Sequence, residues 1–262
     1  MSTNTILFVH GGPCSSAKFE RLHLSHVNDI IWWDQPRENP DNPWPHLLSA
    51  AMQKLDECVQ ACGGPVHLLT SSFGAQIGAN LACSYPEKVR SLVLLAPVFD
   101  VGAAYAGLAE AELAARPTDQ LSKVLKGYRS CPSVETLWPM VGQLFAIPHI
   151  FERLLGELNR TKVDQFMALL GDAEMFDPHF FQITVNSFLA TRECILGRYT
   201  GPVTAIFGRA DSLVPISKTV HELQMRFPQA KSKTVDAGHF PHLEVPFSEW
   251  HPLHLSNNAV SP

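Results

Sequence analysis

The sequence predicts an α/β fold in which a mostly parallel sheet is flanked by helices. Apolar runs of strand length alternate with stretches of helical periodicity, an order that is typical of parallel sheets. The runs at 92–95 and 203–207 are continuously apolar, as expected of strands that are buried on both faces. A chain of 262 residues is long enough for one large α/β domain or for a domain with an insertion.

Six segments of the chain are expected to form the strands. They cover residues 5–9, 29–33, 66–70, 90–96, 202–207 and 231–235. Residues 46–62 have the apolar spacing of a helix and end at Gly63 and Gly64, a common signal for a helix C-terminus. Residues 75–85 are expected to form a second helix, which Pro86 ends.

The stretch between Phe99 and Tyr199 differs from the rest of the chain. It is rich in Ala, Leu and Phe, has helical character broken by prolines, and contains no clear strand. We expect a helical insertion between two halves of the sheet. The domain division is therefore residues 1–100, then the insertion at 101–198, then residues 199–262.

Composition excludes several classes of protein. Hydrophobic residues make up 45% of the chain and charged residues 17%, which rules out a disordered chain. The formal net charge of −5 argues against nucleic-acid binding. No apolar run approaches the roughly 20 residues that a membrane-spanning helix needs. The N-terminus has no secretory pattern and the six cysteines contain no CxxC pair, so we expect a cytoplasmic protein.

The junction between the third strand and the following helix carries the most informative motif. A nucleophile held at such a junction sits on a tight, strained turn, and the helix N-terminus behind it favours negative charge. Small residues are needed two places before and two places after it. Gly74 meets this need, whereas Thr70 stands where glycine is usual. Ser72 is the predicted nucleophile. The alternatives are a helix-capping serine on an ordinary turn, or Ser71 as the nucleophile.

A glycine-containing segment, HGGP at 10–13, follows the first strand. Glycines let the backbone approach a bound carbonyl, so that their N–H groups can point at an oxyanion. The N–H groups of these glycines, together with the N–H of Phe73, are the expected oxyanion hole. The alternative is a plain turn.

Two further motifs, GRADSLVP at 208–215 and GHFPHLEVP at 238–246, supply a carboxylate and an imidazole. A serine hydroxyl needs an imidazole to take its proton, and the imidazole needs a carboxylate to orient it. Asp211 and His239 follow successive strands, and parallel strands bring their C-terminal ends to one edge of the sheet. Asp100 is an alternative acid. His242 is an alternative base, but only His239 directly follows the turn glycine.

These segments together resemble the α/β-hydrolase superfamily. HGGP with the later segment WWDQP at 32–36 is most similar to the prolyl aminopeptidase (proline iminopeptidase) branch, and SSFG at 71–74 and YPEKVRSLVLLAP at 85–97 also match the superfamily. The resemblance implies an α/β-hydrolase fold with an inserted helical cap. The sequence departs from the family pattern in that the leading strands of the usual sheet are expected to be missing. The resemblance also implies Ser72, Asp211 and His239 as catalytic residues, Gly12 and Phe73 as oxyanion donors, and no metal or cofactor.

The expected function is hydrolysis of a small ester or amide through an acyl-enzyme. The alternatives are a lyase or cyclase that uses the same three residues, and a ligand-binding receptor on a hydrolase scaffold. The expected partner is a small-molecule substrate, apolar or aromatic, because the insertion is rich in aromatic residues. These are Tyr105, Tyr128, Trp138, Phe145, Phe151, Phe166, Phe176, Phe180, Phe181 and Phe188. A peptidase would need carboxylates for a substrate ammonium group, and the candidates are Glu135, Glu152 and Glu174.

Overall fold

The computed structural model describes residues 4–38, 41–156, 160–191 and 199–252. The strands form one six-stranded sheet in the order β2-β1-β3-β4-β5-β6, and every pairing is parallel. They are β1 (Ile6–Val9), β2 (Ile30–Trp33), β3 (Val66–Ser71), β4 (Val89–Leu95), β5 (Val203–Gly208) and β6 (Lys231–Val235). The predicted parallel sheet is confirmed, and each predicted strand is within one residue of the observed one at both ends.

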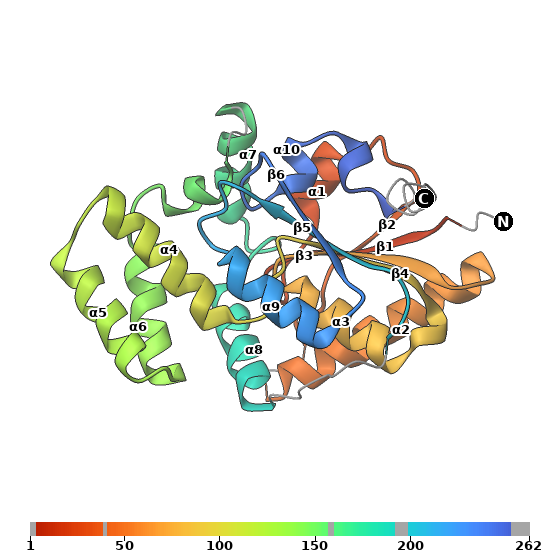
Figure 1. Cartoon of the computed structure of the whole chain (residues 1–262), viewed down its shortest axis with the longest axis horizontal. Helices are drawn as coiled ribbons and strands as arrows, with labels where there is room; N and C mark the ends of the chain where they lie inside the picture. Colours follow the sequence, from red (N-terminus) through yellow and green to blue (C-terminus); the bar gives the residue numbers. More distant parts are fainter. Residues whose placement is uncertain (1–3, 39–40, 157–159, 192–198, 253–262) are drawn as a thin grey trace.

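Helices cover both faces of the sheet (Figure 1). The helices on one face are α2 (Pro43–Cys62), α3 (Gly74–Ser84) and α9 (Ile216–Arg226). Those on the other are α1 (Lys18–His23) and α10 (Pro241–Glu244). The short 3₁₀ helices η1 (Pro86–Lys88) and η3 (Phe247–Glu249) lie in the connections.

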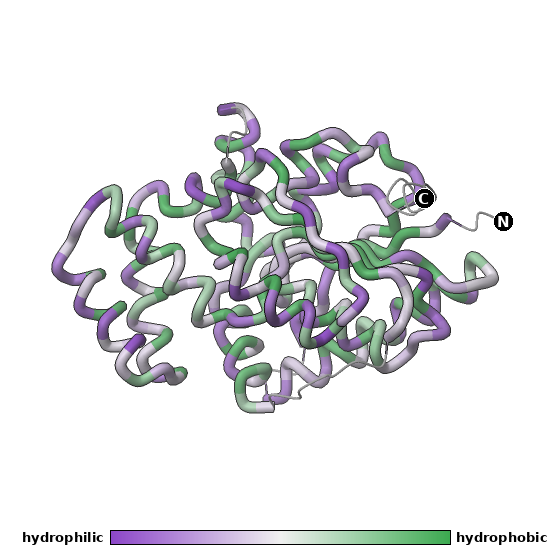
Figure 2. Tube along the Cα trace, in the orientation of Figure 1, coloured by the Kyte–Doolittle hydropathy of each residue, from purple (hydrophilic) through white to green (hydrophobic). Residues whose placement is uncertain are grey.

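Alternate side chains of the inner strands enter the two cores. In β1, Leu7 and Val9 pack with the α2 and α3 side, and Ile6 and Phe8 pack with the α1 and α10 side. Hydrophobic colours follow these strands in Figure 2, and hydrophilic segments lie towards the periphery. Burial on both faces explains why β1 is apolar at every position. The edge strand β6 is much more exposed.

The segment between β4 and β5 contains only helices among its described residues. They are α4 (Val101–Ala115), α5 (Asp119–Ser130), α6 (Val134–Phe145), η2 (Ile150–Leu154), α7 (Arg160–Leu170) and α8 (Pro178–Thr191). Helices α4, α5 and α6 extend away from the sheet, whereas α8 packs beside α2 (Figure 1). The segment joins the C-terminal end of β4 to the next core strand, so its helices lie next to the edge where the predicted site residues are located.

The helices around the sheet differ from expectation in two respects. Helix α2 begins at Pro43, three residues before the predicted start, because prolines are tolerated in the first turn of a helix, where no internal hydrogen bond is lost. The sequence did not indicate helices α1, α9 and α10, and the six-residue α1 and four-residue α10 are too short to show a helical period. Within the described residues, no helix is long and apolar enough to cross a membrane.

Candidate active site

Ser72 lies at the turn between β3 and α3, with a backbone φ of +52°. Positive φ is uncommon for a residue with a side chain and marks a strained turn. The turn is fixed on both sides: the Ser72 N–H donates to Leu95 O at 2.9 Å, and the Ser72 carbonyl accepts from Val98 N at 3.1 Å. The backbone around Ser72 is therefore held by the strand next to it.

Two glycines of α3 allow this helix to pass close to strands β1 and β3. A Cβ atom on Gly74 would lie 2.4 Å from the carbonyl oxygen of Val9, so only glycine fits there. A Cβ atom on Gly78 would lie 2.4 Å from the Cγ2 methyl of Thr70. Thr70 occupies the position of the motif where glycine is usual. Because Gly78 has no side chain, the Thr70 methyl group has space, and β3 and α3 remain in contact.

The three side chains predicted for acid, base and nucleophile meet at the C-terminal edge of the sheet. His239 Nε2 lies 2.9 Å from Ser72 Oγ, and His239 Nδ1 lies 2.8 Å from Asp211 Oδ2. The side chains of His239 and Asp211 are 4% and 1% exposed. The second carboxylate oxygen, Oδ1, accepts the N–H groups of Leu213 at 2.8 Å and Val214 at 3.2 Å. With both oxygens bound, Asp211 can hold the imidazole in one orientation.

The alternative acid and base lie elsewhere. Asp100 accepts the N–H of Ala103 at 2.9 Å as the N-cap of α4, and its other oxygen pairs with Lys218 at 2.6 Å. His242 is 2% exposed, and neither of its ring nitrogens has a hydrogen-bond partner among the described residues. Burial lowers the pKa of His242 to about 3. A ring that stays neutral and makes no contact with a serine is not positioned to act as the base.

The two predicted oxyanion donors face the same cavity as Ser72. Gly12 has a φ of +70°, and both Gly12 and Phe73 line the cavity. Neither N–H donates a hydrogen bond to another residue in the described part of the chain. Backbone N–H groups that are left unpaired beside a serine hydroxyl are available to a bound oxygen atom.

The loop that carries Gly12 is held by Gln35, which follows β2. The Gln35 amide accepts the N–H of Cys14 at 2.9 Å and donates to the carbonyl of His10 at 3.0 Å. His10 is buried, and desolvation lowers its pKa to about 4. This loop is therefore fixed by a neutral hydrogen-bonded network, and the sequence motif DQP supplies its central residue.

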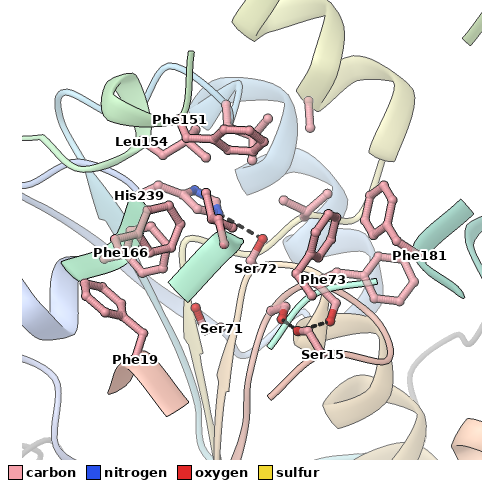
Figure 3. A pocket seen from close by; sticks show the side chains of 18 of the residues that line it. Ser15, Phe19, Ser71, Ser72, Phe73, Phe151, Leu154, Phe166, Phe181 and His239 are labelled. Atoms are coloured by element: carbon pink, nitrogen blue, oxygen red, sulfur yellow. Dashed lines mark hydrogen bonds between the residues drawn. The ribbon is translucent and has the colours of Figure 1, made fainter. Parts of the chain in front are cut away.

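The cavity above Ser72 has a volume of about 150 Å³ and an apolar, aromatic wall. Figure 3 shows His239 and Phe166 on one side of Ser72 and Phe181 on the other. The aromatic residues predicted from the helical segment fall into two groups. Those that line the cavity are Tyr105, Phe145, Phe151, Phe166, Phe176 and Phe181. The others, Tyr128, Trp138, Phe180 and Phe188, pack against the core around it.

The carboxylates predicted for a substrate ammonium group are absent from the described cavity wall. Glu174 is exposed, with 89% of its side chain accessible, and Glu152 pairs with His149 at 2.8 Å. Glu135 is exposed on α6. The carboxyl group that does line the cavity is Glu20 of α1, which sequence reasoning missed. Burial raises the pKa of Glu20 to about 7.

The described residues contain no group of three or more His, Cys, Asp or Glu side chains arranged to hold a metal ion.

The comparison with known families gives a match to a model described as "Alpha/beta hydrolase family" over residues 6–250. That match spans nearly the whole chain and both halves of the sheet.

Several solved structures have the same fold. A proline iminopeptidase from Mycobacterium smegmatis is 18% identical with a TM-score of 0.59, over 98% of this chain and 89% of that one. A proline iminopeptidase-related protein from Thermus thermophilus is 18% identical with a TM-score of 0.64, over 98% and 90%. A putative aryl esterase from Burkholderia cenocepacia is 18% identical with a TM-score of 0.61, over 98% and 90%. At this identity the likeness concerns the fold alone.

Proposed function

Because the chain belongs to the alpha/beta hydrolase family, we propose that it is a serine hydrolase that cleaves a small ester through an acyl-enzyme. The observation that carries the proposal is the hydrogen-bonded series from Asp211 through His239 to Ser72 Oγ, with steps of 2.8 and 2.9 Å. This series ends at a hydroxyl on the wall of a cavity. A protein that only bound a ligand would not require this series of hydrogen bonds.

The proposed reaction has two halves. His239 Nε2 takes the proton of the Ser72 hydroxyl as its oxygen attacks the substrate carbonyl, and Asp211 stabilises the imidazolium that forms. The tetrahedral intermediate collapses when His239 gives this proton to the leaving oxygen, which departs as an alcohol. Water then repeats the sequence on the acyl-enzyme, releasing a carboxylic acid and restoring Ser72.

The N–H groups of Gly12 and Phe73 are proposed to stabilise the negative oxygen of both intermediates. Each such donor is typically worth on the order of 100- to 1000-fold in rate. Their support is the unpaired state of both groups at the cavity, within the described residues. The φ of +70° at Gly12 turns the backbone in a way that other residues rarely adopt.

The helices between β4 and β5 are proposed to form a cap over Ser72, corresponding to the division at 101–198. The support is that Tyr105 of α4, Phe145 of α6 and Phe181 of α8 line the same cavity as Ser72. A volume of about 150 Å³ is close to that of a dry apolar cavity that takes up benzene. The substrate is therefore proposed to be small and apolar, of the size of a short acyl group or one ring.

An ester is favoured over a peptide substrate. A free peptide amine is cationic, and a buried cation needs a partner of opposite charge. Glu135, Glu152 and Glu174 lie outside the cavity wall as described, and Glu20 has a raised pKa that favours its neutral form up to about pH 7.

The test is hydrolysis of 4-nitrophenyl acetate and 4-nitrophenyl butyrate, with the carboxylic acid product measured alongside nitrophenol. We expect Ser72→Ala to lower kcat to the background rate. The adjacent Ser71→Ala is the matched control and should retain turnover. Wild-type protein that bound the esters but released no acid would contradict the hydrolase proposal and would favour a receptor. Equal loss in both serine variants would contradict Ser72 as the nucleophile.

A further inference from the structure

Glu20 is a carboxyl group that the proposed reaction does not use. The residue is 5% exposed and lies on the wall of the cavity that contains Ser72. Its carboxyl oxygens make no hydrogen bond to the side chain or backbone of any other described residue, and His242 Nε2 lies 4.0 Å from its Oε1. The backbone N–H of Glu20 donates to its own carboxyl group, and one such bond leaves most of the hydrogen-bonding capacity of the two oxygens unused. A buried carboxyl group with unused capacity on a cavity wall can bind a ligand.

Glu20 lies in the part of the cavity next to the imidazole of His239, which we call the His239 lobe and define by Phe19, Glu20, Phe166 and Phe240. The Phe240 ring packs 5.6 Å from the His239 ring, 6.0 Å from Phe19 and 5.5 Å from Phe166, measured between centroids. Phe19 and Phe166 lie on the His239 side of Ser72, opposite Phe181 (Figure 3).

The chemistry of the reaction assigns this lobe to one half of the substrate. The leaving oxygen must take its proton from His239 Nε2, so the alcohol part of the ester passes beside the imidazole. The His239 lobe is the space next to that ring. The alcohol part of the substrate therefore extends towards Glu20, whereas the acyl part occupies the side of Phe181.

We propose that Glu20 is a specificity-determining residue that selects esters whose alcohol part carries a second, uncharged hydrogen-bonding group such as a hydroxyl. This inference rests on the proposed function and names its substrate class. A carboxyl group offers an acceptor oxygen and, when protonated, an O–H donor, so that one hydroxyl on the substrate can satisfy it in either direction. The aromatic members of the lobe hold the rest of the alcohol part.

A neutral group is favoured over a cation by what surrounds Glu20. No lysine or arginine is among the described residues that line the cavity, so no positive charge on that wall favours the ionised form of Glu20, and the lobe wall is otherwise aromatic. The same desolvation that raises the pKa of Glu20 to about 7 also opposes bringing a charged substrate group into the lobe. His242 is neutral and supplies no charge of its own, because burial lowers its pKa to about 3.

The test uses three acetate esters with the same aryl leaving group and one changed substituent at the 3-position: hydroxyl, methyl or aminomethyl. In wild-type protein we expect kcat/KM for the hydroxyl ester to exceed that for the methyl ester by about 10-fold, beyond the difference in their rates with hydroxide. Glu20→Gln keeps the shape and an uncharged hydrogen-bonding group, so it should retain a preference for the hydroxyl ester. Glu20→Leu should reduce the ratio to about one.

Glu174→Leu is the matched control, because Glu174 is exposed and lies off the described cavity wall. It should leave the wild-type ratio intact. A wild-type preference for the aminomethyl ester that Glu20→Gln removes would overturn the proposal in favour of charge recognition. A ratio of about one in wild-type protein would overturn it in either form.

Binding without turnover separates this inference from the proposed function. NMR titration of the Ser72→Ala variant with 3-hydroxyphenol and 3-methylphenol measures the lobe without any chemistry. We expect the first to bind more tightly by about 10-fold, and the difference to vanish when Glu20→Leu is added. If wild-type protein hydrolyses no ester but this difference is present, the Glu20 site stands and the hydrolase proposal fails. If hydrolysis is observed and the difference is absent, only the Glu20 inference fails.

Discussion

The contact between Thr70 and Gly78 gives a quantitative prediction about the turn that carries Ser72. A Cβ atom on Gly78 would lie 2.4 Å from the Cγ2 methyl of Thr70, whereas carbon atoms prefer roughly 3.5–4.0 Å. Thr70 is fully buried in β3, and its hydroxyl donates to Val93 O at 3.4 Å. Neither partner can move easily. Gly78→Ala should therefore be destabilising, and Thr70→Ser, which removes only the methyl group, should relieve the clash.

The magnitude follows from two opposing effects. Extra volume in a packed core typically costs about 1–3 kcal/mol, and alanine is favoured over glycine within a helix by about 1 kcal/mol. The net expectation is that Gly78→Ala lowers the free energy of unfolding by up to about 2 kcal/mol in the wild-type background. In the Thr70→Ser background the contact at 2.4 Å is gone and the nearest atom is Leu92 Cδ1 at 3.2 Å, the end of a side chain that can shift slightly. The same change should then raise this free energy by up to about 1 kcal/mol. The coupling free energy between the two positions is then about 2 kcal/mol.

Urea denaturation of the wild type, the two single variants and the double variant measures this coupling. Ester turnover is measured in parallel, since a displaced turn should lower kcat by up to about 100-fold in Gly78→Ala alone. Gly127→Ala on α5 is the control for helix propensity, because a Cβ atom there would contact nothing within 4 Å. Additive effects, within about 0.5 kcal/mol, would refute the steric reasoning.

Three further predictions concern the site and the buried histidine. Asp211→Asn should lower kcat on the order of 10⁴-fold with little change in KM, because the amide would hold the wrong tautomer of His239; an unchanged kcat would exclude this role. Gly11→Ala should abolish most ester turnover, because its Cβ would lie 2.6 Å from Ser72 Cβ; kinetics and a thermal melt separate this from unfolding. His10 has a pKa lowered from 6.5 to about 4 by burial, so its neutral form contributes stability above pH 6.5 that is lost as the pH falls through 4. His10→Asn should flatten the fall in unfolding free energy over that range by up to roughly 3 kcal/mol, and an unaltered slope by urea titration would contradict it.

The strands and the Ser72 turn could be predicted because their signals are local. The inner strands are short, mainly apolar runs that end at a glycine, proline or polar residue, and burial on both faces leaves little choice of side chain there. The Ser72 motif, Asp211 and His239 each follow a strand, so the parallel order alone brings them to one edge. For the strands and for these three residues, the tertiary structure agrees with the sequence pattern.

Glu20 could not be predicted, because its role depends on contacts far along the chain. It sits in a six-residue helix that shows no apolar period, and in sequence it looks like one acid among basic neighbours. Only the folded chain brings Phe166 and Phe240 to the same cavity wall. For the same reason Glu135, Glu152 and Glu174 are equally suitable candidates by sequence, because the sequence does not indicate which face of a helical segment turns towards a cavity.

The most direct test of the central claim is labelling with a fluorophosphonate, which forms a covalent bond only with a serine that a neighbouring base activates. Intact-mass measurement and peptide mapping identify the modified residue. We predict a single adduct on Ser72 that is lost in Ser72→Ala, retained in Ser71→Ala and strongly slowed in His239→Gln. Labelling that persists in Ser72→Ala, or an unlabelled wild-type protein, would contradict the claim that the imidazole of His239 activates this hydroxyl.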